Sequence, residues 1–340
     1  MGCMKRAALL ASLAFWLVAP GAALAAGGPV PPVQDGYIGV PGVPYEYAAW
    51  AAGRDTVVRV KQAGARSTVP GLRLAGRYGI PGVDYGGTTT GLAANGRTLI
   101  LADVPANLPP RTTRLLVLDT EPLAVRARLT LPGWSTVDAI SPDGRWLYLI
   151  RYASPNVSDY EVLAYDLPAH KLLAKPIIDP RDRDEAMTGF PISRVMGPGG
   201  RWAYTLYMRP SRVPFVHALD TTGRRAVCID LPSLANADIG NAHLGLGPGG
   251  TELQIQISSV TRTVINTRTF AVYAGDGGSA RAPARQVAHI RRSSGGPWEL
   301  VLLLIGVVAA GGAQVARHAY RRHPEAATIT VIDPRLTDDA

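Results

Sequence analysis

The stretch Ser141–Ile150, SPDGRWLYLI, combines a tight turn with a strand that begins directly after it. Asp-Gly supplies the positive φ angles that two-residue hairpin turns require, and the aromatic and β-branched residues that follow favour a strand. Three related phrases occur elsewhere: Asn95–Arg97 before TLILAD, Pro198–Gly200 before RWAYTLY and Pro248–Gly250 before TELQIQI. The turn glycines of the four phrases lie 48, 56 and 50 residues apart in chain order, which indicates an internal repeat.

A second pattern repeats in step with the first. After each hairpin comes a β-rich run that ends in Asp or Asn: RLLVLD to Asp119, EVLAYD to Asp166, FVHALD to Asp220 and RTVIN to Asn266. A short turn then leads to a fourth strand, as in AVRARLTL and KLLAKPII. Each unit therefore has four antiparallel strands, which we name A to D in chain order.

The strands of these units are apolar on both faces. In strand B of the quoted unit, Trp146, Tyr148 and Ile150 line one face, and Leu147 and Leu149 line the other. A sheet of this kind must be covered on both sides, and four-stranded sheets set around a common axis cover one another. The sequence therefore predicts an all-β domain, a β-propeller of four-stranded blades.

A degraded unit precedes the four regular ones. Its strands B, C and D are predicted in YEYAAW, TVVRV and STVPGLRLAGRYGI, and Tyr37–Val40 or a C-terminal strand would complete the ring. Gly53 fits a turn between strands A and B or between B and C. This count favours a propeller of five blades, with six as the alternative. One C-terminal transmembrane helix is expected after the propeller.

The phrases Ser141–Tyr148 and Leu116–Asp119 resemble the repeats of bacterial extracytoplasmic β-propellers of the YVTN and WD40-like (TolB-type) groups. The resemblance covers roughly Ala93–Val272. The Gly-His and Trp-Asp pairs of true WD40 repeats are absent, so it holds at the level of the superfamily. It implies a propeller that binds a ligand or a protein, with a few lactonases and hydrolases among its relatives.

The two ends of the chain carry apolar segments. Residues 1–25 have the layout of a secretory signal peptide, with Lys5 and Arg6 before the apolar stretch and Ala23-Leu24-Ala25 at its end. Residues 298–316 are predicted to form a transmembrane helix, with Trp298 at the interface. The numbers of Lys and Arg on the two sides of this helix are equal, so the charges do not set its orientation. The N-terminal signal peptide sets it, because it directs the chain before the helix to the outside of the cell. The remaining parts are a propeller at 30–276, a Gly/Arg/Ser-rich stalk at 277–297 and a short cytoplasmic tail at 317–340.

This layout predicts a single-pass protein of the plasma membrane with its propeller outside the cell and its C-terminus in the cytoplasm. Of the net charge of +9, the propeller and the stalk carry +4 each, which argues for a partner at anionic lipid or wall polymer and against nucleic acid. The membrane itself and another envelope protein or wall polymer are the expected partners. After signal removal only Cys228 remains, so no intrachain disulfide is possible.

The connections between strands favour one end of the propeller as its working face. Strands alternate in direction, so A–B and C–D connections lie at one end and B–C and D–A connections at the other. The B–C connections are long and rich in proline, and the D–A connection after Asp179 is the most highly charged segment of the chain. A charge run of this kind is more often a solvated loop than a ligand site. The candidate binding face comprises Arg111, Tyr152, Arg181, Asp182, Arg183, Asp184, Arg209 and Arg212.

Known catalytic signatures are absent from the sequence. It contains no HExxH, GxSxG, paired CxxC or phosphate-binding glycine loop, and its propeller histidines stand alone. No cofactor or metal is therefore expected. The leading interpretation is a membrane-anchored extracytoplasmic propeller that acts as a binding or protein-interaction module. The alternatives are a surface hydrolase or lactonase with its site in the propeller funnel, and a scaffold subunit of a cell-envelope complex.

Overall fold

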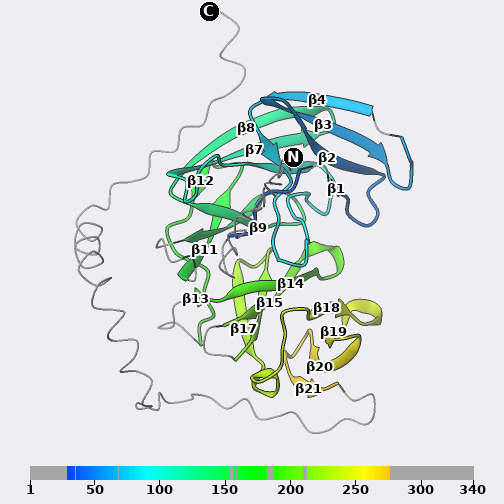
Figure 1. The fold of residues 1–340 in the computed structure, drawn as a ribbon, viewed down its shortest axis with the longest axis vertical. Helices are drawn as coiled ribbons and strands as arrows, with labels where there is room; N and C mark the ends of the chain where they lie inside the picture. The colour runs from blue at the N-terminus through cyan, green and yellow to red at the C-terminus, as the bar shows by residue number, and fades with distance from the viewer. Residues whose placement is uncertain are drawn as a thin grey trace, which may run out of the picture.

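The computed structural model describes residues 29–34, 36–67, 69–152, 157, 159–181, 187–209 and 213–275. In these residues the chain is all-β and forms five antiparallel sheets, each made of strands consecutive in sequence. Figure 1 shows the sheets following one another in an arc around a common centre, with the first sheet at the top and the fifth at the lower right. The predicted order of strands A to D is therefore confirmed within each sheet.

The first and second sheets follow the predicted order without interruption. The first contains β1 (Tyr37–Ile38), β2 (Tyr45–Ala52), β3 (Asp55–Gln62) and β4 (Val69–Ala75). The second contains β5 (Tyr78–Gly79), β6 (Thr98–Asp103), β7 (Thr112–Thr120) and β8 (Leu123–Pro132).

The other three sheets have the same order, with one addition. The third contains β9 (Ser135–Ile140), β10 (Trp146–Tyr152), β11 (Asp159–Asp166) and β12 (Lys171–Leu172), and β13 (Met187–Thr188) also pairs with β11. The fourth contains β14 (Phe190–Met196), β15 (Trp202–Met208), β16 (Phe215–Asp220) and β17 (Arg225–Asp230). The fifth contains β18 (His243–Leu246), β19 (Glu252–Ile257), β20 (Val260–Asn266) and β21 (Val272–Ala274).

The first sheet resolves two open points and corrects a third. Tyr37–Ile38 is strand A, and Gly53 lies in the turn between strands B and C. The prediction that GRYGI belongs to strand D is wrong: Gly76, at a φ of 101°, follows the end of β4, and Tyr78–Gly79 is strand A of the second sheet. The periodic strand pattern continues across this connection because the turn is only two residues long.

The repeated glycines sit in A–B turns that pack against one another. Gly144 has a φ of 74°, and a Cβ there would lie 2.5 Å from Oγ1 of Thr98 in the second sheet. At Gly250 a Cβ would lie 2.5 Å from Pro198 in the A–B turn of the fourth sheet. Glycine is therefore required twice over, by its backbone angle and by the close approach of the neighbouring sheet.

This double requirement predicts the cost of adding a methyl group. Gly144→Ala is expected to lower the free energy of unfolding by about 2 kcal/mol, the sum of a left-handed backbone and a steric overlap. Gly53→Ala is the matched control, because Gly53 has a φ of 69° and open space around it. It should cost only about 1 kcal/mol. Urea unfolding of the two variants measures the difference, and equal losses would show that the turns do not press on each other.

The acidic residues that end strand C hold the A–B turn of their own sheet. Asp166 accepts a hydrogen bond from Arg145 at 3.0 Å, and Asp220 accepts one from Arg201 at 3.1 Å. The arginine in each case directly follows the turn glycine. In the third and fourth sheets, the acid that ends strand C thus has a local structural role.

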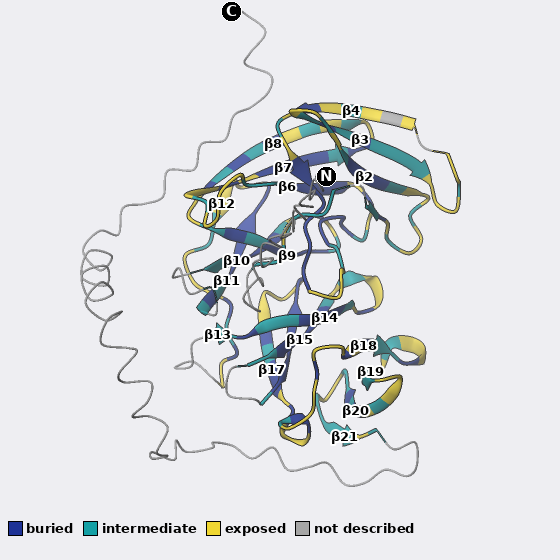
Figure 2. Cartoon of the chain, in the orientation of Figure 1, coloured by how far each residue is buried: buried dark blue, intermediate teal, exposed yellow. Residues whose placement is uncertain are grey.

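Burial confirms that the middle sheets are covered on both faces. Every residue of Thr98–Ala102 is buried, as is every residue of Phe215–Asp220. The first and fifth sheets, at the ends of the arc, each have a more exposed face (Figure 2). On the first sheet, Arg59 covers the ring of Trp50 at 4.3 Å. Gln254 and Gln256 alternate with buried Leu253 and Ile255 on the fifth.

The strands A of neighbouring sheets meet at the centre of the arc, which we call the hub. Arg194 of β14 donates to the carbonyl of Asp138 on β9, and the backbone N–H of Leu244 on β18 donates to Oγ of Ser193 at 3.0 Å. Two further segments enter the hub. Residues 29–34 pair with the second sheet through Val33 and Ile80, at 2.7 and 2.8 Å.

The second of these segments is an excursion of strand A. Residues 81–90 leave the second sheet after Ile80, and the chain returns to pair with β6 at Leu92. At its tip, the backbone N–H of Tyr85 donates to the carbonyl of Pro191 on β14 at 3.1 Å. The excursion therefore crosses from the second sheet to the fourth.

Among the residues that the structure describes, no helix has the length and apolar character needed to cross a bilayer. The predicted signal peptide (1–25), stalk (277–297), transmembrane helix (298–316) and tail (317–340) lie outside the described residues.

Candidate functional site

The long connections predicted for the B–C and D–A end occur in the middle of the arc. The B–C connections of the second, third and fourth sheets cover residues 104–111, 153–158 and 209–214. Their C–D turns are short, as are the A–B turns of the third and fourth sheets. In the first and fifth sheets the B–C turns are only residues 53–54 and 258–259. The elaborated surface is thus a feature of the second to fourth sheets.

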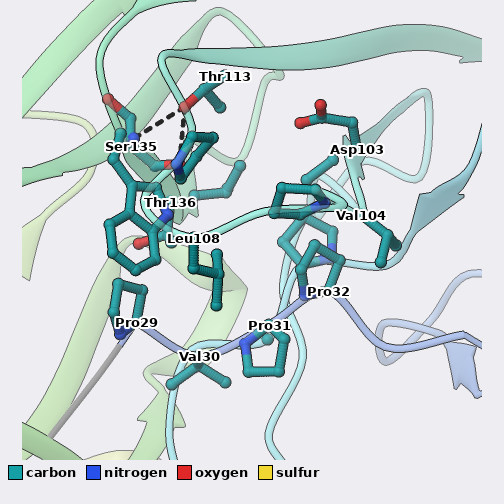
Figure 3. A pocket seen from close by; sticks show the side chains of 17 residues that line it. Pro29, Val30, Pro31, Pro32, Asp103, Val104, Leu108, Thr113, Ser135 and Thr136 are labelled. Carbon is teal, nitrogen blue, oxygen red and sulfur yellow. Dashed lines mark hydrogen bonds between the residues drawn. The ribbon is translucent and has the colours of Figure 1, made fainter.

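A pocket with a volume of about 120 Å³ opens at this end, between the second and third sheets (Figure 3). One wall is the B–C connection after β6, and another is the turn that leads into β9. The N-terminal segment Pro29–Pro32 forms a third wall, and Figure 3 shows Leu108 between this segment and the Ser135–Thr136 side. The lining residues used below are Pro29, Asp103, Leu108, Thr113, Trp134 and Thr136.

A buried threonine positions the wall that carries Trp134. Oγ1 of Thr113 accepts a hydrogen bond from the backbone N–H of Ser135 at 2.8 Å and donates to the carbonyl of Gly133 at 3.0 Å (Figure 3). It therefore ties strand C of the second sheet to the D–A turn that enters the third.

The same pair of hydrogen bonds from one threonine hydroxyl, which we call the clamp, occurs one sheet earlier. Oγ1 of Thr56 accepts from the N–H of Tyr78 at 2.8 Å and donates to the carbonyl of Gly76 at 2.9 Å. Sequence reasoning missed this element. The available signal was a second repeat, because Thr56 and Thr113, like Gly76 and Gly133, are 57 positions apart.

Loss of the clamp has a predicted cost. Thr113→Val keeps the shape of the side chain but leaves the buried N–H of Ser135 without an acceptor, so the free energy of unfolding should fall by about 1–3 kcal/mol. Thr112→Val, at the exposed neighbouring position, is the control and should change stability little. Thermal unfolding of both variants measures the effect. Equal melting temperatures would show that the Thr113 hydroxyl does not hold the turn.

Two residues of the predicted face flank this pocket. Arg111 is exposed, and its carbonyl accepts a hydrogen bond from the N–H of Gly133 at 2.8 Å, next to Trp134. The ring of Tyr152, the last residue of β10, lies 5.4 Å from that of Trp134, and its hydroxyl is 3.4 Å from Oγ1 of Thr136. Burial raises the pKa of Tyr152 above its ordinary value, so this phenol stays neutral at physiological pH.

Two other predicted residues make ion pairs within the protein. Arg181 bonds Asp179 at 2.6 Å and the carbonyl of Cys228 at 2.9 Å, which fastens the D–A connection to β17. Burial alone would raise the pKa of Asp179, but hydrogen bonds, chiefly from Arg181, hold it below the usual value. Arg209 pairs with Asp230 at 2.8 Å and lies 3.9 Å from the centre of the Phe215 ring.

The remaining members of the predicted face, Asp182, Arg183, Asp184 and Arg212, lie outside the described residues. Of the predicted set, the structure thus brings Arg111 and Tyr152 together around the pocket. The binding role of the whole set stays a prediction.

A charged pair lies in the hub, away from solvent. The guanidinium of Arg194 bonds Oδ1 of Asp138 and donates from Nε to Oγ1 of Thr205 at 2.6 Å. His217 pairs with Thr205 across β15 and β16 in register and is 1% exposed. Burial lowers the pKa of His217 to about 4, so it is neutral at physiological pH. Because Asp138 and Arg194 are 1% and 5% exposed, this pair joins two sheets and offers no surface to a ligand.

No group of three or more His, Cys, Asp or Glu side chains in the described part of the chain is arranged to hold a metal ion. The ionisable groups whose pKa values shift most are buried between sheets.

Solved structures with a similar fold include β-propellers of diverse activity. TolB from Acinetobacter baumannii matches 73% of this chain and 52% of its own, with 9% identity and a TM-score of 0.40. The Cps50 (Swd1) β-propeller domain from Myceliophteria thermophila matches 71% and 65%, with 10% identity and a TM-score of 0.39. An oligogalacturonate lyase in complex with manganese matches 72% and 65%, with 11% identity and a TM-score of 0.44.

No protein-family model matches the sequence, and no curated protein matches it. The chain spans about half the length of the TolB structure. Its four-stranded antiparallel sheets, arranged around a common centre, fit a β-propeller, as the repeats predicted. These likenesses concern the fold alone, and they do not distinguish binding from catalysis.

Proposed function

We propose that the protein is a membrane-anchored, extracytoplasmic propeller of five blades that acts as a protein-interaction module. Its binding surface is the B–C and D–A end of the middle sheets, centred on the pocket between the second and third. The observation that carries this proposal is the apolar pocket with Leu108, 65% exposed, in its lining. An exposed large apolar side chain beside an apolar cavity is the composition of a contact surface.

The structure of the hub supports a binding function rather than catalysis at a site in the central funnel. A hydrolase or lactonase of this fold would need ionisable groups that a substrate can reach along the axis. Here residues 29–34 and 81–90 enter the hub, and the ionic pair Asp138 and Arg194 is buried between strands. In the described part of the hub, Asp138 and Arg194 are out of a substrate's reach, so they do not supply the accessible acid and base that general acid–base catalysis needs.

The membrane anchor is proposed from residues 1–25 and 298–316, whose composition is that of a signal peptide and a spanning helix. The test is protease treatment of intact cells that carry the full-length chain with a C-terminal tag. We expect the propeller to be digested and the tag to remain protected. Protection of the propeller in intact cells would overturn the proposed location.

The binding role is tested by photo-crosslinking in the native membrane. A photoreactive amino acid replaces Leu108 in the full-length protein, and in a matched control it replaces Val69, which is 68% exposed at the start of β4. We expect a discrete crosslinked species from position 108 and none from position 69. Absence of a crosslink at 108, together with turnover of a lactone or glycan panel by the wild-type protein, would favour the enzyme.

A further inference from the structure

We infer that the pocket takes one apolar side chain of an extended, acidic segment of a partner protein, and that it does not take a wall polysaccharide. This inference rests on the proposed binding function and specifies the chemistry of its partner. The argument uses the volume of the pocket, the scarcity of hydrogen-bond donors in its walls, its aromatic side and the charge around it.

The volume sets the size of the group that can enter. A cavity of about 150 Å³ holds one benzene molecule, and ligand sites for whole small molecules span several hundred Å³. A pocket of about 120 Å³ therefore accommodates one aliphatic side chain or one proline ring. A hexose with its hydroxyl groups and their hydrogen-bond partners needs more room.

The walls exclude a polyhydroxyl ligand for a second reason. Many lining residues are prolines, which have no backbone N–H to donate: Pro29, Pro31, Pro32, Pro81, Pro105 and Pro110. Ser135 N–H is already bonded to Thr113, and Asp103 is paired with Arg114 at 3.3 Å. Among side chains, only the hydroxyls of Ser135 and Thr136 and the indole N–H of Trp134 remain as donors in this lining. A sugar placed here would therefore lose several hydrogen bonds to water that the walls do not replace, a cost that an apolar group does not have.

The aromatic side of the pocket favours an extended peptide. Trp134 lines the cavity, and Tyr152 adjoins it at 5.4 Å between ring centres. Aromatic rings beside a narrow apolar slot are the surface on which extended, proline-containing peptides dock. The exposed Leu108, which lines the same pocket, supplies the second contact for such a segment.

The charge around the pocket selects an acidic partner. The side chain of Arg114 is 64% exposed, and Arg77 and Arg111 are exposed in loops bonded to pocket walls through Val104 and Gly133. Within the described residues, neither Arg77 nor Arg111 has an ion-pair partner, and the pocket's own Asp103 is engaged. Guanidinium groups in this arrangement favour carboxylates on either side of the anchoring residue.

The test uses full-length protein in detergent and fluorescent synthetic decapeptides with a central leucine or proline. One set has flanking Asp and Glu, a second has flanking Lys and Arg, and a soluble oligosaccharide serves as competitor. We expect the acidic set to bind at least tenfold more tightly than the basic set, with affinity that falls as salt rises. The oligosaccharide should not compete. Equal binding of both sets, or displacement by the oligosaccharide, would overturn the inference.

Variants locate the binding at the pocket. Leu108→Asp should weaken the acidic peptide at least tenfold, because it places a carboxylate at the apolar slot. Val69→Asp, matched in exposure, should leave affinity unchanged. Arg111→Glu should weaken the acidic set and reduce the preference over the basic set. Loss of affinity in the Val69 variant equal to that in the Leu108 variant would place the peptide elsewhere and refute the site.

Trp134 gives a readout that does not depend on the label. Its fluorescence should change when an acidic peptide binds, and Trp134→Phe should abolish that change. If peptides fail to bind while the Leu108 photo-crosslink persists, the inferred chemistry is wrong and the interaction module stands. If both fail, the proposed function fails with it.

Discussion

Arg194→Met is expected to lower the free energy of unfolding by about 3–5 kcal/mol, because it leaves the buried carboxylate of Asp138 without its cation. Arg194 bonds both the carboxylate and the backbone carbonyl of Asp138, and it also bonds Thr205. The variant therefore leaves a buried charge and further polar atoms unsatisfied in the hub. Urea denaturation followed by tryptophan fluorescence measures the loss.

The double variant Asp138→Leu with Arg194→Met is the control. It removes both charges together, so its stability should lie well above that of Arg194→Met alone. A double variant as unstable as the single one would mean that packing volume, and not the stranded charge, accounts for the loss. The comparison separates the ionic contact between the third and fourth sheets from the shape of the side chains that make it.

Acidification is expected to destabilise the propeller between about pH 6.5 and pH 4 through His217. Burial holds the pKa of His217 at about 4 in the folded protein, against 6.5 when unfolded, with Asp138, Arg194 and Asp179 as the charged groups that act on it. The unfolded chain therefore binds a proton first. The contribution to stability is complete above the unfolded pKa and falls as pH drops toward 4, by about 3 kcal/mol in total.

His217→Gln should flatten this slope, whatever its effect on stability at neutral pH. His243→Gln, at an exposed position of β18, should leave the slope unchanged. The measurement is the free energy of unfolding in urea at half-unit steps of pH. The buried aspartates with lowered pKa values, Asp179 and Asp220, contribute at lower pH, because their stabilisation is lost as pH falls through a depressed pKa. An unchanged slope in His217→Gln would refute the assignment.

Local patterns were sufficient for the strands and their order. Asp-Gly and Gly-Gly turns, strand alternation and the acid at the end of strand C act over a few residues, so the hairpins of the second to fifth sheets could be located from sequence. The first sheet was harder, because its turns carry no repeated phrase. There the boundary at Gly76 was missed, since the strand-like pattern continues directly into Tyr78.

The candidate site was only partly predictable. The loop-rich end was identified from connection lengths, and Arg111 and Tyr152 lie beside the pocket there. Arg181 and Arg209 were selected as exposed charges, but their partners Asp179 and Asp230 engage them within the protein. Trp134 and Leu108 were not selected, because a single apolar residue in a loop has no distinctive pattern until its neighbours are known.

The sequence by itself determined a chain of repeated hairpins whose middle sheets are apolar on both faces and so must be covered by neighbouring sheets. Only the tertiary structure decided which distant residues meet: Arg194 with Asp138, Val33 with Ile80, and Tyr85 with Pro191. Strand and turn preferences arise from interactions within a few residues, whereas a pocket or a buried ion pair depends on contacts between segments that are far apart in the chain. The pocket has walls from three such segments, and it exists only when the N-terminal residues pair with the second sheet.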